Sequence, residues 1–564
     1  MMKKRNTHLT KPWQTGRAPL HSMMLLWIAL TMASCYGEGL PLPPQSDPEP
    51  TPDPIPESKP AIDLSSCCDL FQAYAEAQQQ GKESTLLNFS YAGYEHGEQA
   101  LPDVDYPEIK VDDYGAIPGD GQSDREALQA AIKAAEALVA GGRQGAVVRF
   151  STGRYDLHPE GSDTTPFTIS SSNIVLRGTR NATGETELYM ETPNPSNDGS
   201  LWNSNELIMF TYSGAKSDDQ LKLTDVVADA PIGSHTIQVR STSGLSMGQR
   251  VLLKMNNNDP ELVADEVKPY DISSEWTELP NEGVLVTEYH TIARIEGQQV
   301  TFVEPLMHKV ESRWGWTLHR YQHHVGCGVE EITFRGNFQE NFVHHLNALH
   351  DSGYRMITFR RQVNGWIRRC RFIDVSEALS VMLSANVSVL DCQIEGHTGH
   401  SSIRSQASSY VLIGRCTDEP AQYHSFGVSK TAIGTVLWRN TTAANSCFES
   451  HSSQPRATLL DACSGGFVPN HAGGDAALGP NHLGGLTLWN YRERSSGSGL
   501  FDLWVRNNRF LMPVIVGYQG STKFKPEQVT CDESHGRAVY PESLYEAQLI
   551  LRLGYLPEWI SANP

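Results

Sequence analysis

The chain has 564 residues, and 45 Lys and Arg against 65 Asp and Glu give it a formal net charge of −20. With 39% hydrophobic and 20% charged residues, it has the composition of a globular protein and not of a disordered or collagen-like chain. This charge argues against a general nucleic-acid-binding protein, because phosphates are bound by basic surfaces. The acidity is uneven: residues 35–310 carry a net charge of −25, whereas residues 311–460 carry +2 and hold ten of the twenty His. The second stretch is therefore where an anionic partner could bind.

Residues 1–34 predict a secretory signal peptide. They carry five basic residues and no acidic one, and an apolar run at 23–30 is followed by small residues. The small residues end directly before Cys35, as in a bacterial lipobox, although Met32 stands where Leu is usual. We expect an exported protein that a lipid on Cys35 anchors to the outer membrane or cell surface. The alternative is ordinary signal cleavage near Cys35, which would give a periplasmic or secreted protein.

Short β-type strings recur later in the chain at a nearly constant spacing. Cys370, Cys392, Cys416 and Asn440 close four of them and lie 22, 24 and 24 residues apart. A β-rich unit that recurs at this period is typical of a solenoid, in which each coil buries its apolar face against its neighbours. We interpret these Cys as an inward-facing stack of small apolar side chains, because no CxxC with zinc spacing occurs in the chain.

The start of the repeating region carries a distinctive motif. Asp-Tyr-Gly-Ala at 113–116 leads into a Gly/Asp turn and a predicted helix at 124–136, and Phe-Ser-Thr-Gly-Arg-Tyr-Asp-Leu follows at 150–157. Together with the coils, these strings resemble the pectate-lyase-like right-handed parallel β-helix superfamily, including its polygalacturonase-type hydrolases, over roughly residues 105–530. The resemblance implies an all-β solenoid whose N-terminal mouth is plugged by the helix at 124–136. It specifies the fold more closely than the reaction.

The coil pattern lapses between residues 212 and 310, where short apolar runs and turns predict a small insertion of antiparallel strands. Near the C-terminus, Ser543 and Glu546 form a capping box before an amphipathic helix, which we expect to cap the open end of the solenoid. Nine Pro between residues 41 and 60 predict an extended tether. The expected segments are a signal peptide (1–34), a lipid-anchored tether (35–62), an N-terminal extension (63–104), N-terminal coils (105–211), the insertion (212–310), catalytic coils (311–530) and a C-terminal cap (531–564).

The residue types of the stretch 311–460 favour one kind of polysaccharide chemistry. A glycosidase needs two carboxylates at a set separation, yet this stretch has only four Asp and none in a paired motif of the polygalacturonase type. A lyase instead needs a group that neutralises the carboxylate of a uronate and a base that removes the C5 proton. His, Arg, Lys and Tyr can fill these roles, and they are concentrated here.

Aligning the second strand of successive coils predicts one face for these side chains. If Val381, Ile403, Phe426 and Phe448 point inward, the residues at alternating positions point outward. The catalytic candidates are His400, Arg404, His424, His451 and Tyr423. The substrate-binding candidates are His345, Asn347, Gln406, Lys430, Glu449, Arg456, and Trp314 with Trp316 as a sugar-stacking platform.

The roles that we assign follow from this chemistry. His451 or His400 would be the base, and Arg404 with Asn347 or Gln406 would neutralise the carboxylate. His424 or Tyr423 would be the acid, with Tyr354 as a further candidate. No cofactor is required by this scheme. The family resemblance makes Ca²⁺ held by carboxylates an option, which the scarcity of acidic residues on this face does not favour.

The sequence therefore predicts a polysaccharide lyase that cleaves a uronate-containing anionic chain by β-elimination. The substrate would be a glycosaminoglycan such as chondroitin sulfate, or an algal or pectic polyuronate, and no nucleic acid is expected as a partner. One alternative is a glycoside hydrolase on the same scaffold that uses Glu449 and another carboxylate. The other is a non-catalytic glycan-binding surface protein.

Overall fold

In a computed structural model, the described residues are 62–159, 161, 163–469, 471–495, 497 and 499–561. The predicted signal peptide, Cys35 and all of the predicted tether except Ile62 lie outside these residues. Within the described part of the chain, no helix combines the length and the apolar character needed to cross a membrane.

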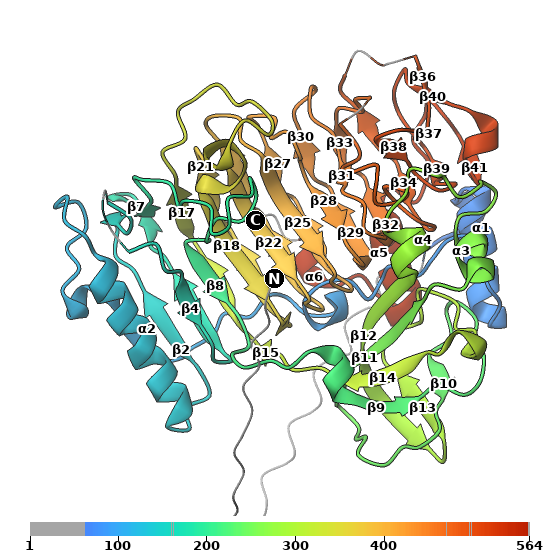
Figure 1. Ribbon diagram of the computed structural model, residues 1–564, viewed down its shortest axis with the longest axis horizontal. Helices are drawn as coiled ribbons and strands as arrows, with labels where there is room; N and C mark the ends of the chain where they lie inside the picture. The colour runs from blue at the N-terminus through green and yellow to red at the C-terminus, as the bar shows by residue number, and fades with distance from the viewer. Residues whose placement is uncertain are drawn as a thin grey trace, which may run out of the picture. The chain divides into compact units, whose positions relative to one another are not determined.

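Three parallel sheets run along the solenoid (Figure 1). The first has 12 strands, in the order β1 (Glu108–Lys110), β2 (Ala146–Arg149), β5 (Ile174–Arg177), β16 (Gly328–Glu330), β20 (Trp366–Arg368), β23 (Ser388–Leu390), β26 (Leu412–Gly414), β29 (Ile433–Trp438), β32 (Arg456–Asp461), β34 (Thr487–Trp489), β39 (Val514–Val516) and β41 (Cys531–Glu533). The second has ten: β3 (Gly153–Asp156), β7 (Gly184–Tyr189), β17 (Ile332–Arg335), β21 (Arg371–Ile373), β24 (Gln393–Glu395), β27 (Thr417–Asp418), β30 (Thr441–Thr442), β33 (Ser464–Gly465), β35 (Arg492–Glu493), and β6 (Arg180–Asn181) beside β7.

The third parallel sheet has seven strands and carries the residues of interest below. Its order is β31 (Glu449–Ser450), β28 (Gly427–Ser429), β25 (Ser401–Gln406), β22 (Glu377–Met382), β18 (Arg355–Arg360), β8 (Ile208–Phe210) and β4 (Phe167–Ile169). The central coils each add one strand to each sheet, as β20, β21 and β22 do, so the predicted all-β parallel β-helix is confirmed. Three short strand pairs lie outside these sheets: β15 (His324–Val325) with β19 (Gln362–Val363), β36 (Leu500–Phe501) with β40 (Lys523–Phe524), and β37 (Trp504–Val505) with β38 (Asn508–Arg509).

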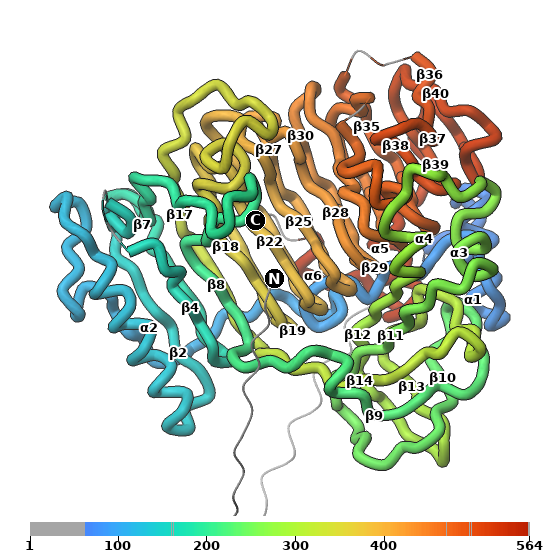
Figure 2. The backbone as a smooth tube through the Cα atoms, viewed as in Figure 1, coloured from blue at the N-terminus to red at the C-terminus, as the bar shows by residue number. Residues whose placement is uncertain are grey.

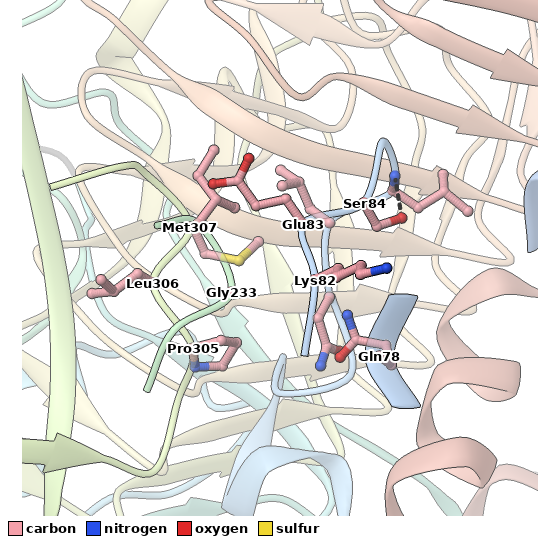
Figure 3. Close-up of a pocket in the computed structure, with 12 residues that line it drawn as sticks. Gln78, Lys82, Glu83, Ser84, Gly233, Pro305, Leu306 and Met307 are labelled. Carbon is pink, nitrogen blue, oxygen red and sulfur yellow. Dashed lines mark hydrogen bonds between the residues drawn. The ribbon is translucent and has the colours of Figure 1, made fainter. Parts of the chain in front are cut away.

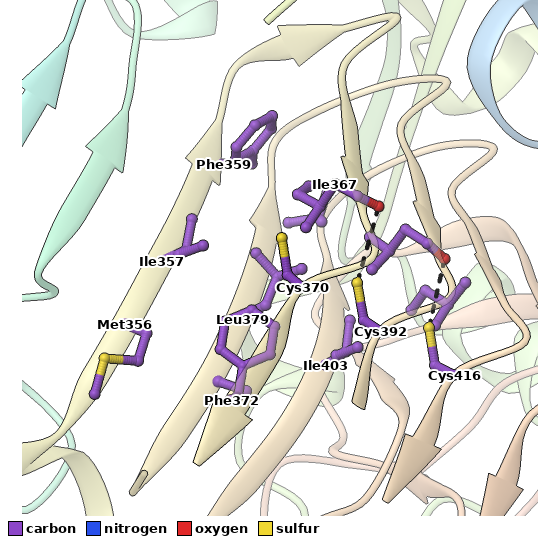
Figure 4. Close-up of a cluster of buried hydrophobic side chains, with 14 of the residues drawn as sticks. Met356, Ile357, Phe359, Ile367, Cys370, Phe372, Leu379, Cys392, Ile403 and Cys416 are labelled. Carbon is purple, nitrogen blue, oxygen red and sulfur yellow. Dashed lines mark hydrogen bonds between the residues drawn. The ribbon is translucent and has the colours of Figure 1, made fainter. Parts of the chain in front are cut away.

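The core between the three sheets contains the predicted stack of cysteines (Figure 4). Cys370, Cys392 and Cys416 are fully buried, and they come from three successive coils. Each thiol points to backbone carbonyls of its own or the preceding coil, as Cys416 does to Val389 at 3.6 Å. All nine described cysteines are free, and burial raises the pKa of the Cys392 thiol. The cysteines therefore act as small apolar fillers, as predicted.

Helix α2 (Arg125–Ala140) closes the N-terminal end of this core, as predicted. Its buried face contributes Leu128, Ala131 and Ile132 to the same apolar cluster as the first coil, and it contacts β1, β2 and β4. The helix begins after Asp124, whose carboxylate accepts hydrogen bonds from the N–H groups of Ile117 and Asp156. These bonds join the start of the helix to the turn before it and to the first coil.

The insertion is an antiparallel sheet of six strands, in the order β10 (Thr236–Gln238), β13 (Gln299–Phe302), β12 (Val284–Glu296), β11 (Arg250–Asn257), β14 (Thr317–Arg320) and β9 (Lys222–Asp225). Short helices α3 (Pro260–Glu266) and α4 (Leu279–Glu282) accompany it. It extends further than predicted, because β14 continues this sheet to Arg320. Trp314 and Trp316 therefore belong to the insertion and not to the coils.

The C-terminal helix α5 (Leu544–Leu553) forms at the predicted residues but does not lie across the open end of the solenoid. It packs on the outer face of the 12-stranded sheet, where Leu412, Val436 and Trp438 form one apolar cluster with its buried side. Large apolar side chains on that face explain this position. A short helix α6 (Glu558–Ser561) follows.

Helix α1 (Asp69–Gln80) covers the same sheet beside its last strand. The N–H groups of Asp69 and Leu70 donate to the Glu533 carboxylate of β41. An N-terminal helix and a C-terminal strand thus lie side by side, as the blue and red segments at the right of Figure 2 show.

Candidate functional site

The predicted face lies on the seven-stranded sheet, over β22, β25, β28 and β31. The strand register places Ser380, Arg404, Gly427 and Glu449 in one row across these four strands. The neighbouring Ile403 is fully buried in the solenoid core, so Arg404 faces the other way, as the alternation predicts. His424 precedes β28 and pairs with Ser401, one coil back.

Gly427 has a steric reason to be glycine. A Cβ atom there would lie 2.3 Å from the carbonyl oxygen of Glu449 on the next strand. Without a side chain at Gly427, the space between Arg404 and Glu449 in the row stays open to the side chains around it. Gly474 plays a similar part for His451, because a Cβ there would lie 2.5 Å from Cγ of the imidazole.

Histidine rings gather over this row from three parts of the chain. The ring centres of His344 and His400 are 5.6 Å apart, those of His344 and His424 are 5.2 Å apart, and those of His400 and His424 are 4.9 Å apart. His451 adds a fourth ring, 5.3 Å from that of His424. Tyr423 stacks on His344 with ring centres 3.9 Å apart. We call these five side chains the histidine cluster.

Several polar atoms of the cluster are buried without a hydrogen bond. Nε2 of His344, of His400 and of His424 has no hydrogen-bond partner among the residues that the structure describes. Buried polar groups are normally hydrogen-bonded, and leaving one unpaired costs about 1–3 kcal/mol. So many at one place indicate a site that is completed by a bound species.

Two carboxylates stand behind the rings. Glu449 is fully buried, with Oε1 at 3.0 Å from His424 Nδ1 and 3.6 Å from His451 Nε2. Glu377 has Oε1 at 3.6 Å from His400 Nδ1 and 3.7 Å from Arg404 Nη2, and its other oxygen accepts a hydrogen bond from Arg355 at 2.6 Å. Burial alone would raise the pKa of Glu377, but the nearby Arg355, with His400 and Arg404, holds it well below its usual value.

His344, His424 and His451 are shifted toward the neutral form. Burial, together with the neighbouring histidines, lowers the pKa of His344 to about 3. Burial also lowers the pKa of His424 and of His451, in the second case against the opposing effect of Glu449. With Arg404 close to Glu377, the face is less cationic than the sequence predicts. Neutral imidazoles instead offer nitrogen lone pairs.

Three groups of side chains in the described part of the chain could hold a metal ion, and all lie here. They are His344, His400 and His424; His345, Asp351 and His400; and His424, Glu449 and His451, with the ligand atoms of each group within 4.8 Å of one another. These donors are mostly imidazole nitrogens. Ca²⁺, which prefers six to eight oxygen ligands, does not fit such a set.

The structure brings most of the predicted site residues together. His400, Arg404, His424, His451, Tyr423 and Glu449 form or adjoin the cluster, and His345 lies at its exposed edge with its ring stacked on His344 at 3.7 Å. Gln406 lies two residues along β25 and donates to the Ser380 hydroxyl, and Lys430 follows β28 at the surface. Asn347 is exposed, and its side-chain oxygen accepts the N–H of His350.

Arg456 and the tryptophans lie elsewhere. Arg456 bonds to Glu266 and to the carbonyl of Leu285, so it joins the solenoid to the insertion. Trp314 and Trp316 are buried in the apolar core of the insertion, so neither ring is available to stack on a sugar. The platform expected from them is absent, because both rings are buried just before β14 joins the insertion sheet. Tyr354 is also buried, and its hydroxyl donates to the carbonyl of Glu191.

The sequence reasoning left His344 and Asp351 out of the site, and it considered Glu377 only as one of the carboxylates that a hydrolase could use. Glu377 pairs in register with Ser401, so extending the strand alignment toward the N-terminus would have found it. His344 and Asp351 come from a long loop and a π-helical turn (Leu349–Gly353) outside the coil repeat. The only signal for them was the adjacent pair His344-His345.

A separate crevice lies between the N-terminal extension and the insertion, where Lys82, Glu83 and Ser84 face Pro305 to Met307 (Figure 3). It contains none of the predicted site residues.

Part of the chain matches a known family model. Residues 421–563 match a Domain of unknown function (DUF4955). The matched part includes Tyr423, His424, Glu449 and His451, whereas His344 and His400 lie before it. No curated protein matches the chain.

Several solved structures are similar to this chain at low identity. The tailspike protein gp49 from Pseudomonas phage LKA1 has 12% identity and a TM-score of 0.39 over 74% of this chain, which spans 64% of the tailspike's length. A hyperthermoactive exopolygalacturonase from Thermotoga maritima has 11% identity and a TM-score of 0.30 over 76% of this chain and 82% of its own. The mannuronan C-5 epimerase AlgE4 A-module of Azotobacter vinelandii has 10% identity and a TM-score of 0.27, over 76% of this chain and 96% of its own. The parallel β-helix is evident from the sheets of this chain itself.

Proposed function

We propose that this protein is a polysaccharide lyase that cleaves a uronate-containing anionic chain by β-elimination. The observation that carries the proposal is the meeting of Arg404, Tyr423 and His451 from three successive coils on one face of the seven-stranded sheet. A glycosaminoglycan or a polyuronate could lie along such a row, because successive strands of a sheet are about 4.8 Å apart.

The chemistry assigns each of these side chains a task. Arg404 would neutralise the uronate carboxylate, which makes the C5 proton more acidic. His451 is the candidate base, because its side chain is 31% exposed whereas His400 and His424 are enclosed. As the C5–H bond breaks, a C4–C5 double bond forms and the C4–O bond breaks. The hydroxyl of the half-buried Tyr423 would give its proton to the leaving oxygen.

Hydrolysis has weaker support from the same residues. Glu449 is fully buried behind the rings, and Glu377 is hydrogen-bonded by Arg355. A glycosidase needs one carboxylic acid and one carboxylate on either side of the scissile bond. This pair does not offer that arrangement.

The test is to incubate the full-length protein with chondroitin sulfate, alginate and pectate and to follow the ultraviolet absorbance of unsaturated uronate. We expect this absorbance to rise with one of these polymers. New reducing ends without it would overturn the lyase and favour the hydrolase. Binding without any cleavage would overturn both and leave a glycan-binding protein.

We also propose that the protein is exported and anchored through a lipid on Cys35, on the evidence of the sequence pattern before that residue. Labelling with radioactive palmitate should mark the wild type and not a Cys35→Ser variant. Equal labelling of the two proteins would contradict the anchor.

A further inference from the structure

The three inner histidines of the cluster have the spacing of imidazoles around a single ion. Zinc binds imidazole nitrogen at about 2.0–2.1 Å, which puts each ring centre about 3.2 Å from the ion, and tetrahedral ligands then have ring centres about 5.2 Å apart. The three centre-to-centre distances among His344, His400 and His424 are 5.6, 5.2 and 4.9 Å. Each of these three rings offers one ligand nitrogen, and the three nitrogens lie within 4.8 Å of one another.

The ring nitrogens of these histidines are also arranged as in a metal site. In His424 and in His400 it is Nδ1 that lies next to a carboxylate, Glu449 at 3.0 Å and Glu377 at 3.6 Å. A carboxylate behind one ring nitrogen is the usual support of a metal-binding histidine, because it orients the ring and leaves the other nitrogen for the ion. Nε2 of all three histidines is buried and has no partner in the described part of the chain.

We propose that His344, His400 and His424 bind one divalent transition-metal ion of the zinc class through their Nε2 atoms. Three imidazoles with an open fourth position are typical of catalytic zinc sites. Bound metal would also supply the missing partners of these buried nitrogens, which accounts for their number at one place.

The other nitrogen-rich group, made of His424, Glu449 and His451, fits less well. It would use Glu449 as a ligand and so remove the carboxylate that supports His424. The side chain of His451 is also more exposed, at 31%, than those of His400 and His424. We therefore place His451 beside the ion and not on it.

The role of the ion in the reaction rests on the function proposed above. Its open position could take one carboxylate oxygen of a uronate, which would add to the neutralising effect of Arg404. Binding of the ion itself does not depend on that function, so the two proposals can fail separately.

The test measures metal first and activity second. Purified full-length protein is stripped with a chelator, loaded with Zn²⁺, dialysed and analysed by elemental mass spectrometry, without any polysaccharide. We expect about one ion per chain in the wild type. His344→Ala and His424→Ala should lose it, whereas His451→Ala and His397→Ala should retain it. His397 is the matched control, because it lies only three residues before His400 but its ring bonds to Asp374, outside the cluster.

Further measurements keep the result clear if a variant folds poorly. Calorimetric titration of the stripped wild type with Zn²⁺ should show one site, and Glu449→Gln should weaken it by about 10- to 100-fold through loss of the support to His424. Absence of binding to the wild type would overturn the proposal, and so would loss of the ion in His451→Ala with retention in His344→Ala. Lyase activity in the fully stripped protein would remove the ion from the reaction, while bound Zn²⁺ without lyase activity would refute only the function.

Discussion

At the scale of single residues, Arg404 is the side chain on which the proposed reaction depends most. Its guanidinium lies 3.7 Å from Glu377, and that carboxylate is already held by Arg355 at 2.6 Å, so Arg404 can turn to an added anion. Arg404→Ala should lower kcat by about 10²- to 10³-fold, the usual effect of removing one charge-stabilising group. Steady-state kinetics on the polymer that the wild type cleaves would measure this. Arg369→Ala, which removes an arginine paired with Glu331 on another face, is the control. Full activity in Arg404→Ala would refute the assignment.

His482 makes a prediction about stability and pH. It is fully buried, with Nε2 at 2.9 Å from the Thr458 hydroxyl, and burial lowers its pKa to about 3. The unfolded chain takes up a proton here below about pH 6.5, which the folded chain cannot do until about pH 3. The free energy of unfolding should therefore fall as the pH falls through this window, by up to about 1.4 kcal/mol per pH unit from this group.

Urea denaturation at several pH values between neutral and about pH 4 would test this slope. His482→Gln should have a shallower dependence on pH than the wild type, because the variant lacks this proton uptake. An unchanged slope in His482→Gln would show that His482 is not the group responsible.

The same scale shows why sequence reasoning found part of the site. Alternation along a strand predicts direction, so Arg404, Glu449 and His451 could be placed on one face from the coil repeat alone. The loop that delivers His344 follows no repeat, so its position depends on tertiary packing against Tyr423. Trp314 was wrongly placed in the site. In the sequence, a tryptophan that packs in a core looks the same as one that stacks on a sugar, and Trp314 packs in a core.

At the scale of elements, helix α5 is held to the solenoid by Asp461, the last residue of strand β32. The Asp461 carboxylate accepts the N–H of Leu544 at 2.8 Å and of Tyr545 at 3.1 Å, and it also accepts the Ser543 hydroxyl. Asp461→Ala leaves these buried donors unpaired and should cost about 1–3 kcal/mol of stability. Ser543→Ala removes the hydroxyl that caps the helix and also donates to Asp461, and loss of the cap should cost about 1 kcal/mol.

Hydrogen exchange followed by mass spectrometry would locate the effect. We expect faster exchange over Leu544–Leu553 in Asp461→Ala, while the strands of the first coils keep their protection. Equal protection of the helix in variant and wild type would contradict a docking role for Asp461. The helix itself was predictable from its cap and periodicity, but the surface on which it packs was not. Glu546 bonds to Trp438 and Arg439 of the sheet, and these partners are more than a hundred residues away in the sequence.

At the scale of the whole molecule, the net charge of −20 and the histidine-rich face belong to different parts of the chain. The tether, the first coils and the insertion carry the acidity. The coils beneath the cluster are close to neutral, which lets an anionic polymer approach there. This division could be seen in the sequence. How the insertion and the N-terminal extension attach to the solenoid could not, because the attachment depends on a buried polar network.

Glu304 is the centre of that network. It is fully buried and accepts hydrogen bonds from Arg250 at 3.0 Å and from the N–H of Thr291 at 2.7 Å, and it lies 2.7 Å from Nε2 of His96. Arg250 also donates to Asn386 of the solenoid at 2.8 Å. One carboxylate thus joins the insertion, the N-terminal extension and the coils.

Glu304→Ala should therefore loosen the attachment of three parts of the molecule at once. Removing one partner leaves Arg250 buried without its counter-charge, which typically costs about 3–5 kcal/mol. Denaturation should show a lower midpoint, and limited proteolysis should cut the insertion sooner than in the wild type. Glu296→Ala, at an exposed position at the end of β12 in the same insertion, should leave both unchanged. If Glu304→Ala resisted protease as well as the wild type did, the insertion would be held by its apolar contacts with the 12-stranded sheet, and the network would contribute little to the attachment.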